Sequence, residues 1–478
     1  MNNMNNQLLK TVCLFVALTF VLFVIGIFYN CTGNKTTVPV ENRIKPYPEN
    51  SFYWQYEGQP VLLLGATDND NLFQNPNLKS HLDSLKAAGG NYIRNTMSDR
   101  DPDNEKAFFK NENGLYNLNK WNDAYWDKFE NMLKHTSERD IIVQLEIWDR
   151  FDHSRDQWLT DPFNPKNNIN YTFEEAKLDS LYPKHPGANE QPFFFTVPES
   201  NNNEIVLKFQ EAFVKKLLSH SLKYGNVLYC IDNETSGTEE WAKYWAGFIK
   251  ENSANKEIYI TQMWDHWDIK SDTHKRTLDH PERYGFIDIA QNSHNAGFNN
   301  WENAQFIFNY ISDNPRPVNS TKIYGSSGYE PWLNRGMTSE HAVETFFRNI
   351  VGGFASSRFH RPPHGLGLSE PSINSIKTIR EIENHVKIWE INPRMNLLQD
   401  VDENEAYLSA KEGEKYVIYF PGEGNVSLDL NSFDYPFTLR WINTHNAEWA
   451  KKEKIEGGNL VVLETSSREG SIAVITKR

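Results

Sequence analysis

Short apolar segments alternate with longer amphipathic stretches through most of the chain. The apolar segments are typical of strands buried on both faces, and the stretches between them have the 3.6-residue period of helices. We expect eight strands, at residues 61–64, 91–96, 141–148, 227–231, 257–263, 286–290, 321–324 and 352–360. Helices are expected between them, including residues 81–88, 121–139, 205–223, 239–251, 341–351 and 372–388. Repetition of the strand-then-helix unit predicts an α/β fold, a (β/α)8 TIM barrel spanning residues 45–397.

The pattern changes after Asn392-Pro393. Short stretches of alternating apolar and polar residues follow, separated by turn sequences such as Pro421-Gly-Glu-Gly424. Alternation with a period of two, without any helical stretch, is typical of half-buried strands. Residues 400–478 are therefore predicted to form a small C-terminal all-β sandwich domain.

The first forty residues are predicted to be a targeting segment rather than part of the fold. Residues 12–29 form an apolar run that follows Lys10, and Cys31 comes shortly after it. The run is intermediate in length between the core of a signal peptide and a short membrane span. Two readings stay open, a lipid anchor on Cys31 and an uncleaved helix. Both predict an exported protein, attached to a membrane at the cell surface or in the periplasm.

Composition excludes some classes of function. The chain has 49 basic and 63 acidic residues, a net charge of −14, which argues against a nucleic-acid partner. Three cysteines cannot build a disulfide framework, and Cys230 lies inside a predicted strand. The 14 tryptophans suit a bulky barrel core, and some suit stacking on sugars. Residues 151–204 form an insertion rich in Asn, Pro and aromatic residues, and so long a loop is usually functional.

The most suggestive polar residues follow the fourth predicted strand. Residues 227–231 run directly into Asp232-Asn233-Glu234, and a helical pattern begins at Glu239. In α/β barrels the chemistry takes place at the carboxyl ends of the strands, where these side chains are expected. The alternative is that Asp232 and Asn233 only turn the chain and that Glu234 precedes the helix.

The fourth-strand motif carries a resemblance to a known family. A barrel whose fourth strand ends in Asn233-Glu234 resembles clan A of the retaining glycoside hydrolases, and Arg94-Asn95 on the second strand is similar to that clan. The C-terminal segment, with Tyr416-Val-Ile-Tyr-Phe-Pro421 and Arg440-Trp441, resembles the collagen-binding-type β domain that follows the barrel in apiosidase-like glycosidases. The resemblance covers residues 45–478.

The resemblance implies a pair of catalytic carboxylates. Glu234 would be the general acid/base, and Asn233 would hold the sugar hydroxyl next to the reacting carbon. A retaining mechanism needs a second carboxylate at the end of strand seven, about 5–5.5 Å from the first. Its charge would raise the pKa of the acid and keep it protonated.

The chain departs from the clan's pattern at the seventh strand. Where apiosidase-like relatives often read Gly-Glu-Pro-x-Tyr-Glu, this chain reads Gly325-Ser-Ser-Gly-Tyr-Glu330. Ser326 stands in the place of the expected nucleophile, and only the second glutamate remains. Glu330 is therefore the candidate nucleophile, and the alternative is that it only supports the site. Glu146, Asp149 and Asp265 are lesser candidates on neighbouring strand ends.

Further polar and aromatic residues near strand ends are candidates for binding substrate: Asn233, Arg94, Asn95, Trp148, Trp264, His294 and Trp332. Trp267 belongs to the same group of stacking candidates, and plain packing is the alternative for each tryptophan. Arginines near four strand ends, Arg94, Arg150, Arg358 and Arg361, suit either a carboxylate-bearing sugar or salt bridges to nearby acids. No spacing typical of metal ligands occurs, so no metal and no cofactor are expected.

These patterns together predict an exported glycoside hydrolase that cleaves O-glycosidic bonds in an oligosaccharide or polysaccharide. The alternative is a non-catalytic glycan-binding protein, or an adhesin, on a degenerate glycosidase barrel. The oligomeric state is not predicted.

Overall fold

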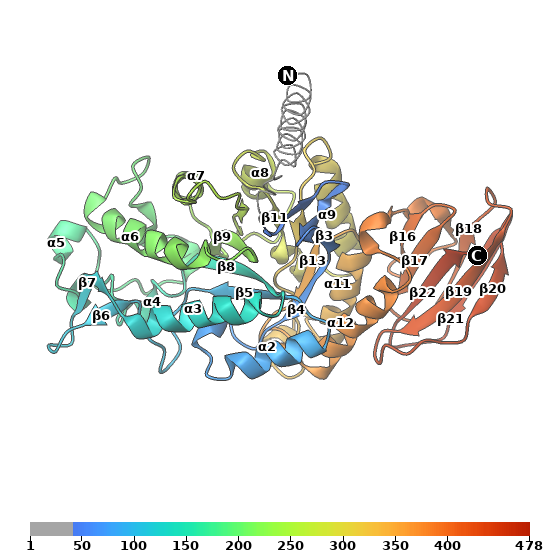
Figure 1. Ribbon diagram of the computed structural model, residues 1–478, viewed down its shortest axis with the longest axis horizontal. Helices are drawn as coiled ribbons and strands as arrows, with labels where there is room; N and C mark the ends of the chain where they lie inside the picture. The colour runs from blue at the N-terminus through green and yellow to red at the C-terminus, as the bar shows by residue number, and fades with distance from the viewer. Residues whose placement is uncertain (1–41) are drawn as a thin grey trace, which may run out of the picture. The chain divides into compact units, whose positions relative to one another are not determined.

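The computed structural model describes residues 42–478, and its larger part is a ring of eight parallel strands surrounded by helices (Figure 1). The strands are β4 (Leu63–Ala66), β5 (Tyr92–Thr96), β8 (Ile142–Asp149), β9 (Val227–Asn233), β10 (Ile260–Thr261), β11 (Ile287–Asp288), β12 (Val318–Asn319) and β13 (Ser356–Phe359). Six of them form one sheet in the order β10-β9-β8-β5-β4-β13, and β11 pairs with β12.

Backbone hydrogen bonds join these two sheets into a closed barrel. The amide of Gly285 donates to the carbonyl of Ile260 at 3.0 Å, which links β10 to the segment entering β11. On the other side, the amide of Ala355 donates to the carbonyl of Val318 at 2.8 Å, which links β13 to β12. The predicted (β/α)8 barrel is confirmed.

One helix follows each strand: α2 (Leu78–Ala87), α3 (Asp123–Ser137), α6 (Glu204–Ser221), α7 (Glu239–Glu251), α8 (Asp272–Leu278), α9 (Gly297–Tyr310), α11 (Ser339–Val351) and α12 (Glu370–Glu383). Helix α7 shows why these segments are helical. The hydroxyl of Thr238 accepts a hydrogen bond from the amide of Trp241 and caps the first turn. Trp241, Trp245 and Ile249, four residues apart, form one buried stripe against the sheet.

Two of the predicted strands are displaced from the observed ones. Residues 61–64 divide between the end of β3 (Gln59–Val61), which belongs to a separate sheet, and the start of β4. The seventh strand, β12, ends before Thr321, so the predicted strand at 321–324 is instead the segment that leaves the barrel. It stays extended, because Ile323 still bridges to Phe359 of β13.

A small antiparallel sheet that the sequence did not predict covers the end of the barrel where the strands begin. It consists of β1 (Lys45–Tyr47), β2 (Asn50–Tyr56) and β3. Trp54 on β2 is fully buried, and its indole Nε1 donates to Oδ1 of Asn319 at 3.0 Å. The Trp54 ring packs edge-to-face against Tyr259 and Phe286. These contacts close that end to solvent.

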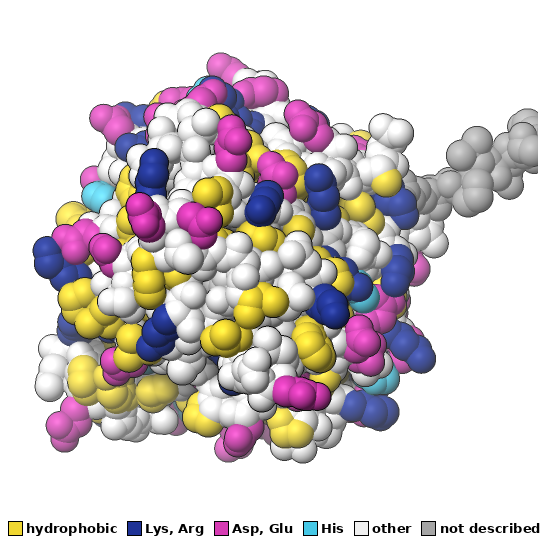
Figure 2. All heavy atoms as spheres, turned by 90° about the vertical axis from the view of Figure 1, so that its left-hand side faces the viewer, with side chains coloured by type: hydrophobic (Ala, Val, Ile, Leu, Met, Phe, Trp, Pro, Cys, Tyr) yellow, Lys and Arg dark blue, Asp and Glu magenta, His cyan; other side chains and the backbone are white. Residues whose placement is uncertain are grey.

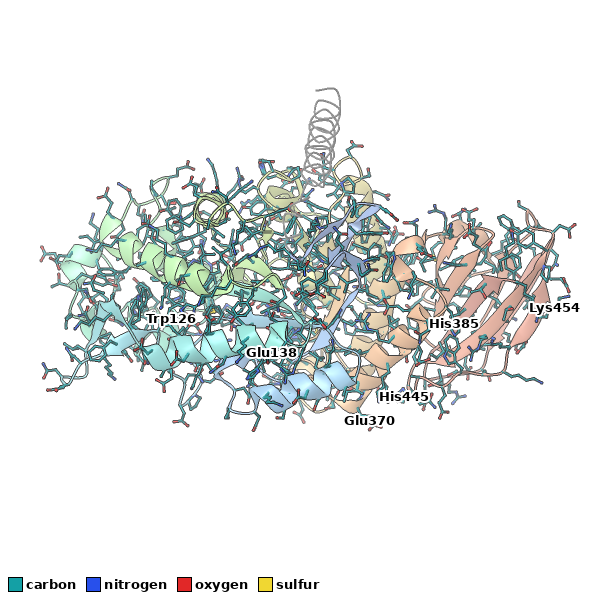
Figure 3. The ribbon with its side chains drawn as sticks, in the orientation of Figure 1. Trp126, Glu138, Glu370, His385, His445 and Lys454 are labelled. Atoms are coloured by element: carbon teal, nitrogen blue, oxygen red, sulfur yellow. The ribbon has the colours of Figure 1, made fainter. Side chains whose placement is uncertain are left out.

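The long insertion after β8 packs its aromatic residues into the core of the barrel domain. It contains α4 (Arg155–Trp158), α5 (Phe173–Ala176) and the 3₁₀ turns η2 (Pro165–Asn167), η3 (Pro186–Ala188) and η4 (Pro192–Phe195). Trp158, Phe193 and Phe194 are fully buried, so they hold the insertion together rather than face a ligand. A hairpin of β6 (Phe108–Lys110) and β7 (Tyr116–Trp121) precedes α3, whose Trp126 is labelled in Figure 3.

The C-terminal residues form the predicted β sandwich. One sheet has the order β14 (Asn392–Pro393), β16 (Tyr407–Lys411), β17 (Lys415–Phe420), β22 (Ser471–Lys477), β19 (Pro436–Asn443) and β20 (Glu453–Glu456). The other consists of β15 (Leu398–Gln399), β18 (Gly424–Asp429) and β21 (Leu460–Thr465). Because β14 pairs with β16, the sandwich begins at Asn392 rather than at the expected residue 400.

Apolar contacts join the sandwich to the barrel. Tyr407 packs on Trp301 of α9 with ring centroids 4.9 Å apart, and Tyr419 packs on Phe347 of α11 at 5.4 Å. Near the end of α12, Nε2 of His385, labelled in Figure 3, lies 3.1 Å from Nη1 of Arg440. The barrel helices α9 and α11 therefore bury part of their surface against the β domain.

The predicted targeting segment, residues 1–40, lies outside the described residues. Across residues 42–478, no helix is both long and apolar enough to cross a membrane.

Gly65 in β4 gives a test of how tightly the barrel is packed. A Cβ added there would overlap the carbonyl oxygen of Tyr92 on β5. Gly65→Ala should therefore lower the free energy of unfolding by about 1–3 kcal/mol, the usual cost of overpacking, as measured by urea denaturation. Gly247→Ala is the matched control: it lies in α7 with nothing within 4 Å of the added Cβ, and should raise stability by up to about 1 kcal/mol. Equal stability of Gly65→Ala and the wild type would contradict this packing.

Candidate active site

A cavity of about 570 Å³ opens at the carboxyl ends of the barrel strands. Three carboxyl groups line it, those of Asp70, Glu234 and Asp265. They follow β4, β9 and β10 respectively. This is the end of the barrel where α/β-barrel enzymes carry out their chemistry.

Glu234 comes directly after β9, and its backbone is left-handed, with φ at +45°. Few residues other than glycine take this conformation, so the turn here is constrained. The side chain is 16% exposed, and its Oε1 accepts hydrogen bonds from Nζ of Lys322, at 2.8 Å, and from the hydroxyl of Tyr324. Glu234 is therefore held by two donors from the segment that follows β12.

This environment keeps Glu234 ionised. Burial by itself raises the pKa of the carboxyl, but the charge and hydrogen bond of Lys322, with the hydrogen bond of Tyr324, outweigh burial and lower the pKa to about 2. A general acid must hold a proton at the working pH. In this structure Glu234 is a carboxylate at neutral pH, which favours the role of a nucleophile or base over that of an acid.

Lys322 and Tyr324 were missed as site residues. Both lie in the segment predicted as the seventh strand, where alternate residues share one face, and both line the cavity. Lys322 is 1% exposed and also donates to Oδ1 of Asn233. A lysine inside an apolar strand pattern was the available signal, because a buried ammonium group needs partners. Its ammonium group stands on the seventh-strand side, where the clan's pattern places a carboxylate.

Asp265 differs from Glu234 in protonation. It lies on the next strand exit, and its backbone amide donates to the carbonyl of Thr235 at 2.8 Å. Desolvation by the cavity walls and then the negative charge of Glu234 raise the pKa of Asp265 to about 6, and solvent screening limits this effect because the residue is exposed. Two neighbouring carboxyl groups thus have pKa values moved in opposite directions, the pattern by which acid and base roles are separated in enzymes.

Arg94 ties the predicted motif residues together. It is fully buried, with Nε donating to Oε1 of Glu146 at 2.6 Å, Nη1 to Asp70 and Nη2 to Oδ1 of Asn233 at 2.9 Å. Nδ2 of Asn233 donates in turn to Oδ2 of Asp149 at 2.9 Å. Arg94 and Asn233, which are predicted to bind substrate, both line the cavity.

Asp70, which the sequence did not single out, is the shared acceptor of three arginines. Besides Arg94, it accepts from Nη2 of Arg100 at 3.1 Å and from Nε of Arg361 at 2.5 Å. Burial would raise the pKa of Asp70, but these guanidinium groups and His360 hold it well below its usual value. Asp70 therefore keeps its negative charge at neutral pH and holds the three arginines together at the cavity.

An aromatic wall stands on the other side of Glu234. The rings of Tyr324 and Trp332 stack with centroids 5.2 Å apart and planes 16° apart, and His294 lies 4.7 Å from Tyr324. Burial lowers the pKa of His294 and favours its neutral form. Trp332 and His294, which are also predicted to bind substrate, line the cavity, and their ring faces suit the apolar face of a sugar ring.

The structure does not bring Glu330 to the cavity. Glu330 is exposed at the first position of α10 (Glu330–Leu333), and it is not among the residues that line the cavity with Glu234. The predicted nucleophile therefore gains no support from the geometry. The loop beginning at Gly325 leads away into α10, where Trp332, two residues later, turns back to the cavity wall.

Three predicted substrate-binding residues face elsewhere, and these expectations are corrected. Asn95 follows Arg94 in β5, so it points to the opposite face, where its Oδ1 accepts from the amide of Phe73 at 3.0 Å. Trp148 is 2% exposed and packs against Trp245 of α7 at 5.3 Å. Trp264 is 1% exposed, and its Nε1 donates to Oγ1 of Thr277 at 2.7 Å. All three serve packing.

The four strand-end arginines also separate into two groups. Arg94 and Arg361 line the cavity, where both pair with Asp70. Arg150 is buried under Phe194, 4.0 Å from its ring centroid, and Arg358 donates to the carbonyl of Thr321 at 2.6 Å. Neither of these lines the cavity. Within residues 42–478, no group of three or more His, Cys, Asp or Glu side chains is arranged to hold a metal ion.

Comparison with solved structures identifies similar barrels. A glycoside hydrolase family 5 structure from Bacteroides vulgatus is 13% identical, with a TM-score of 0.63 over 91% of this chain and 93% of that one. Another glycoside hydrolase is 12% identical, with a TM-score of 0.62 over 91% and 97%. An α-amylase from Geobacillus thermoleovorans, complexed with acarbose, is 10% identical, with a TM-score of 0.53 over 91% and 97%.

The chain has the fold of the family 5 glycoside hydrolases. At this identity the likeness concerns the fold alone. A scan against protein-family models finds no match, and a search of curated proteins finds none either. Any inference about function therefore rests on the residues of the site.

Removing the ammonium group of Lys322 should expose its effect on Glu234. In the wild type the lowered pKa of Glu234 stabilises the fold above about pH 4.5, and this contribution is lost as pH falls towards 2. The difference in unfolding free energy between the wild type and Lys322→Met should therefore be largest at neutral pH and shrink by roughly 3 kcal/mol on acidification. Urea denaturation between pH 7 and pH 3 measures most of this change.

Lys79→Met is the control. Its ion pair with Asp83 measures 2.7 Å but is exposed, so the substitution should change stability little at any pH. A difference between the wild type and Lys322→Met that does not vary with pH would show that Lys322 does not set the ionisation of Glu234.

Proposed function

We propose that the protein is a glycoside hydrolase in which Glu234 and Asp265 are the two catalytic carboxyl groups. The supporting observation is that these groups share one cavity on neighbouring strand exits, with the pKa of Glu234 lowered to about 2 and that of Asp265 raised to about 6. Glycoside hydrolysis needs one carboxyl group that holds a proton and one that has lost it.

The two roles follow from the protonation states. Asp265 keeps its proton in mildly acidic solution and donates it to the leaving glycosidic oxygen. Glu234 is ionised and acts at the sugar carbon, as a nucleophile or by activating water. Asn233 and the wall of Trp332 and His294 would hold the sugar beside them. This reverses the assignment of Glu234 as acid/base that the clan resemblance implies; the apiosidase-like resemblance remains a prediction.

A second candidate is a glycan-binding protein without hydrolytic activity. The observation in its favour is the Lys322–Glu234 ion pair, since an ammonium group stands where the clan's pattern has a carboxylate. Complete absence of hydrolysis of bound glycans would decide for this candidate.

Substitution of the two carboxyl groups tests the roles. Asp265→Asn should lower kcat/KM on a natural glycan about 10²–10⁴-fold, because proton transfer to the leaving oxygen is lost. It should do much less harm on an aryl glycoside whose leaving group needs no proton. Glu234→Gln should lower kcat/KM on both kinds of substrate. Release of reducing sugar and of the aryl alcohol, measured across a panel of glycosides, gives both numbers.

The pH dependence is a second readout of the same roles. Activity of the wild type should fall as pH rises through about 6, because Asp265 loses its proton there. Asp268→Asn, three residues along the same loop and outside the cavity lining, is the matched control and should behave as the wild type. Sparing of aryl glycoside cleavage in Glu234→Gln, but not in Asp265→Asn, would restore Glu234 as the acid and overturn our assignment.

We also propose that residues 1–40 export the chain and attach it to a membrane, on the basis of the apolar run before Cys31. Cells expressing the full chain should then hold it in the membrane fraction. Cys31→Ser should release it if the anchor is a lipid and leave it in place if the anchor is an uncleaved helix. Recovery of intact wild-type chain from the cytosol would contradict export.

A further inference from the structure

The cavity lining carries more positive than negative side chains, although the whole chain is acidic, with a net charge of −14. The basic residues that line it are Arg94, Arg100, Arg155, Lys322, Arg335 and Arg361. Against these six stand the three carboxyl groups of Asp70, Glu234 and Asp265. On the face of the molecule seen in Figure 2, in contrast, acidic and basic side chains intermingle.

Pairing accounts for four of the six cations. Lys322 pairs with Glu234, and Arg94, Arg100 and Arg361 all pair with Asp70. Acidic residues outside the cavity lining balance the remaining positive charge of two arginines. Glu146 pairs with Arg94, and Asp149 and Asp152 pair with Arg100. These side chains are structural partners of one another, so they do not by themselves point to a charged ligand.

Arg155 and Arg335 are different. Neither makes an ion pair with any residue between 42 and 478. Arg155 begins α4 in the insertion, with its guanidinium 5.8 Å from the ring centroid of Phe151. Arg335 follows α10 and lies over Trp332 at 5.4 Å. Two different rim loops thus each present one uncompensated guanidinium group to the cavity.

Arg335 also borders a second cavity, again of about 570 Å³. The two cavities share Asp265, Gln291, His294 and Arg335, so they form one continuous cleft. The second cavity adds Trp267, which is exposed to 66% and whose ring, within residues 42–478, stacks only on the neighbouring His266, with centroids 6.2 Å apart. An exposed indole and a guanidinium group without an ion pair, lining the same cavity, offer a stacking face and an anion site to one ligand.

We propose that the substrate is an anionic glycan, whose carboxylate or sulfate groups are bound by Arg335 and Arg155 on the two sides of Glu234 and Asp265. A guanidinium group forms paired, charge-assisted hydrogen bonds with either anion and loses less hydration than an ammonium group would. This inference names the substrate class for the proposed hydrolase, but its evidence and its test concern binding alone.

The competing explanation is that the two arginines only cover aromatic rings. Arg276 supplies the matched control, since it lies over Trp264 at the same 5.4 Å but outside both cavities. If ring contact were the whole role of Arg335, substitution of either arginine would have the same effect on glycan binding.

The test is binding of the full chain to an array of immobilised glycans that are uronate-containing, sulfated or neutral. The wild type should bind acidic glycans and not their carboxyl-reduced or desulfated counterparts, and the bound class tells carboxylate from sulfate. For a bound oligosaccharide, calorimetry should show that Arg335→Met and Arg155→Met each weaken binding about tenfold or more. Arg335→Lys should recover part of the loss, and Arg276→Met should bind as the wild type. Added salt should weaken wild-type binding more than that of Arg335→Met.

Binding to neutral glycans only, no binding to any member of the array, or equal effects of Arg335→Met and Arg276→Met would overturn the proposal. Its failure can be told apart from failure of the proposed function. Hydrolysis of neutral glycans that is unaffected by Arg335→Met refutes the anionic substrate and keeps the hydrolase. Selective binding of acidic glycans without release of reducing ends keeps the anionic ligand and refutes the hydrolase.

Discussion

A guanidinium group without solvent contact must find all its partners inside the protein, and Arg94 of β5 finds them on or just after three other strands of the same sheet. Glu146 belongs to β8, Asp70 follows β4, and Asn233 ends β9. Burying an unpaired charge would cost several kcal/mol, so these contacts hold only together. One side of the barrel mouth is therefore in place before any ligand arrives. The positions of Asn233 and of the glutamate after it follow from that requirement.

The same chain of contacts sets the protonation of the site. Oδ1 of Asn233 accepts from both Arg94 and Lys322, and Lys322 pairs with Glu234. A residue leaving the seventh strand thereby decides the ionisation of one leaving the fourth. Desolvation, and after it the negative charge held on Glu234, then raise the pKa of Asp265 on the fifth. The opposite pKa shifts of the two carboxyl groups thus depend on residues from several strand exits, which explains why no single motif contains them.

The fold could be predicted from the sequence because the two periods, helical and strand-like, repeat without interruption. Residues next to strand ends, such as Asn233, Arg94 and His294, were also placed correctly, since parallel strands end at one rim. Facing was harder. Asn95 neighbours Arg94 and points the other way. In β8 the alternation of sides breaks, because Glu146 and Asp149 both contact residues that line the cavity while Trp148 packs on a helix.

Glu330 and Lys322 show that a pattern along the chain gives neither the exact end of a strand nor the residues that meet at the site. The seventh strand lies three residues earlier than the apolar run suggests. The segment from Gly325 to Glu330, which resembles the clan's seventh-strand motif, has therefore already left the barrel. The glutamate of that segment lies in α10, outside the cavity, and the lysine that reaches the site was read as part of a strand. Pairing partners far apart in sequence, such as Arg361 with Asp70, depend on the closed ring and leave no local signal.

The left-handed backbone of Glu234 determines which substitutions at this position would stabilise the fold. At φ +45° a glycine would relieve strain on the order of 1 kcal/mol, and asparagine is also better tolerated there than glutamate. A protein released from any need for a carboxylate at this point would gain stability through either replacement. It would also lose the reason to bury Lys322 opposite it. Retaining both residues keeps a local disadvantage, which the proposed catalytic role of the Glu234 carboxylate would require.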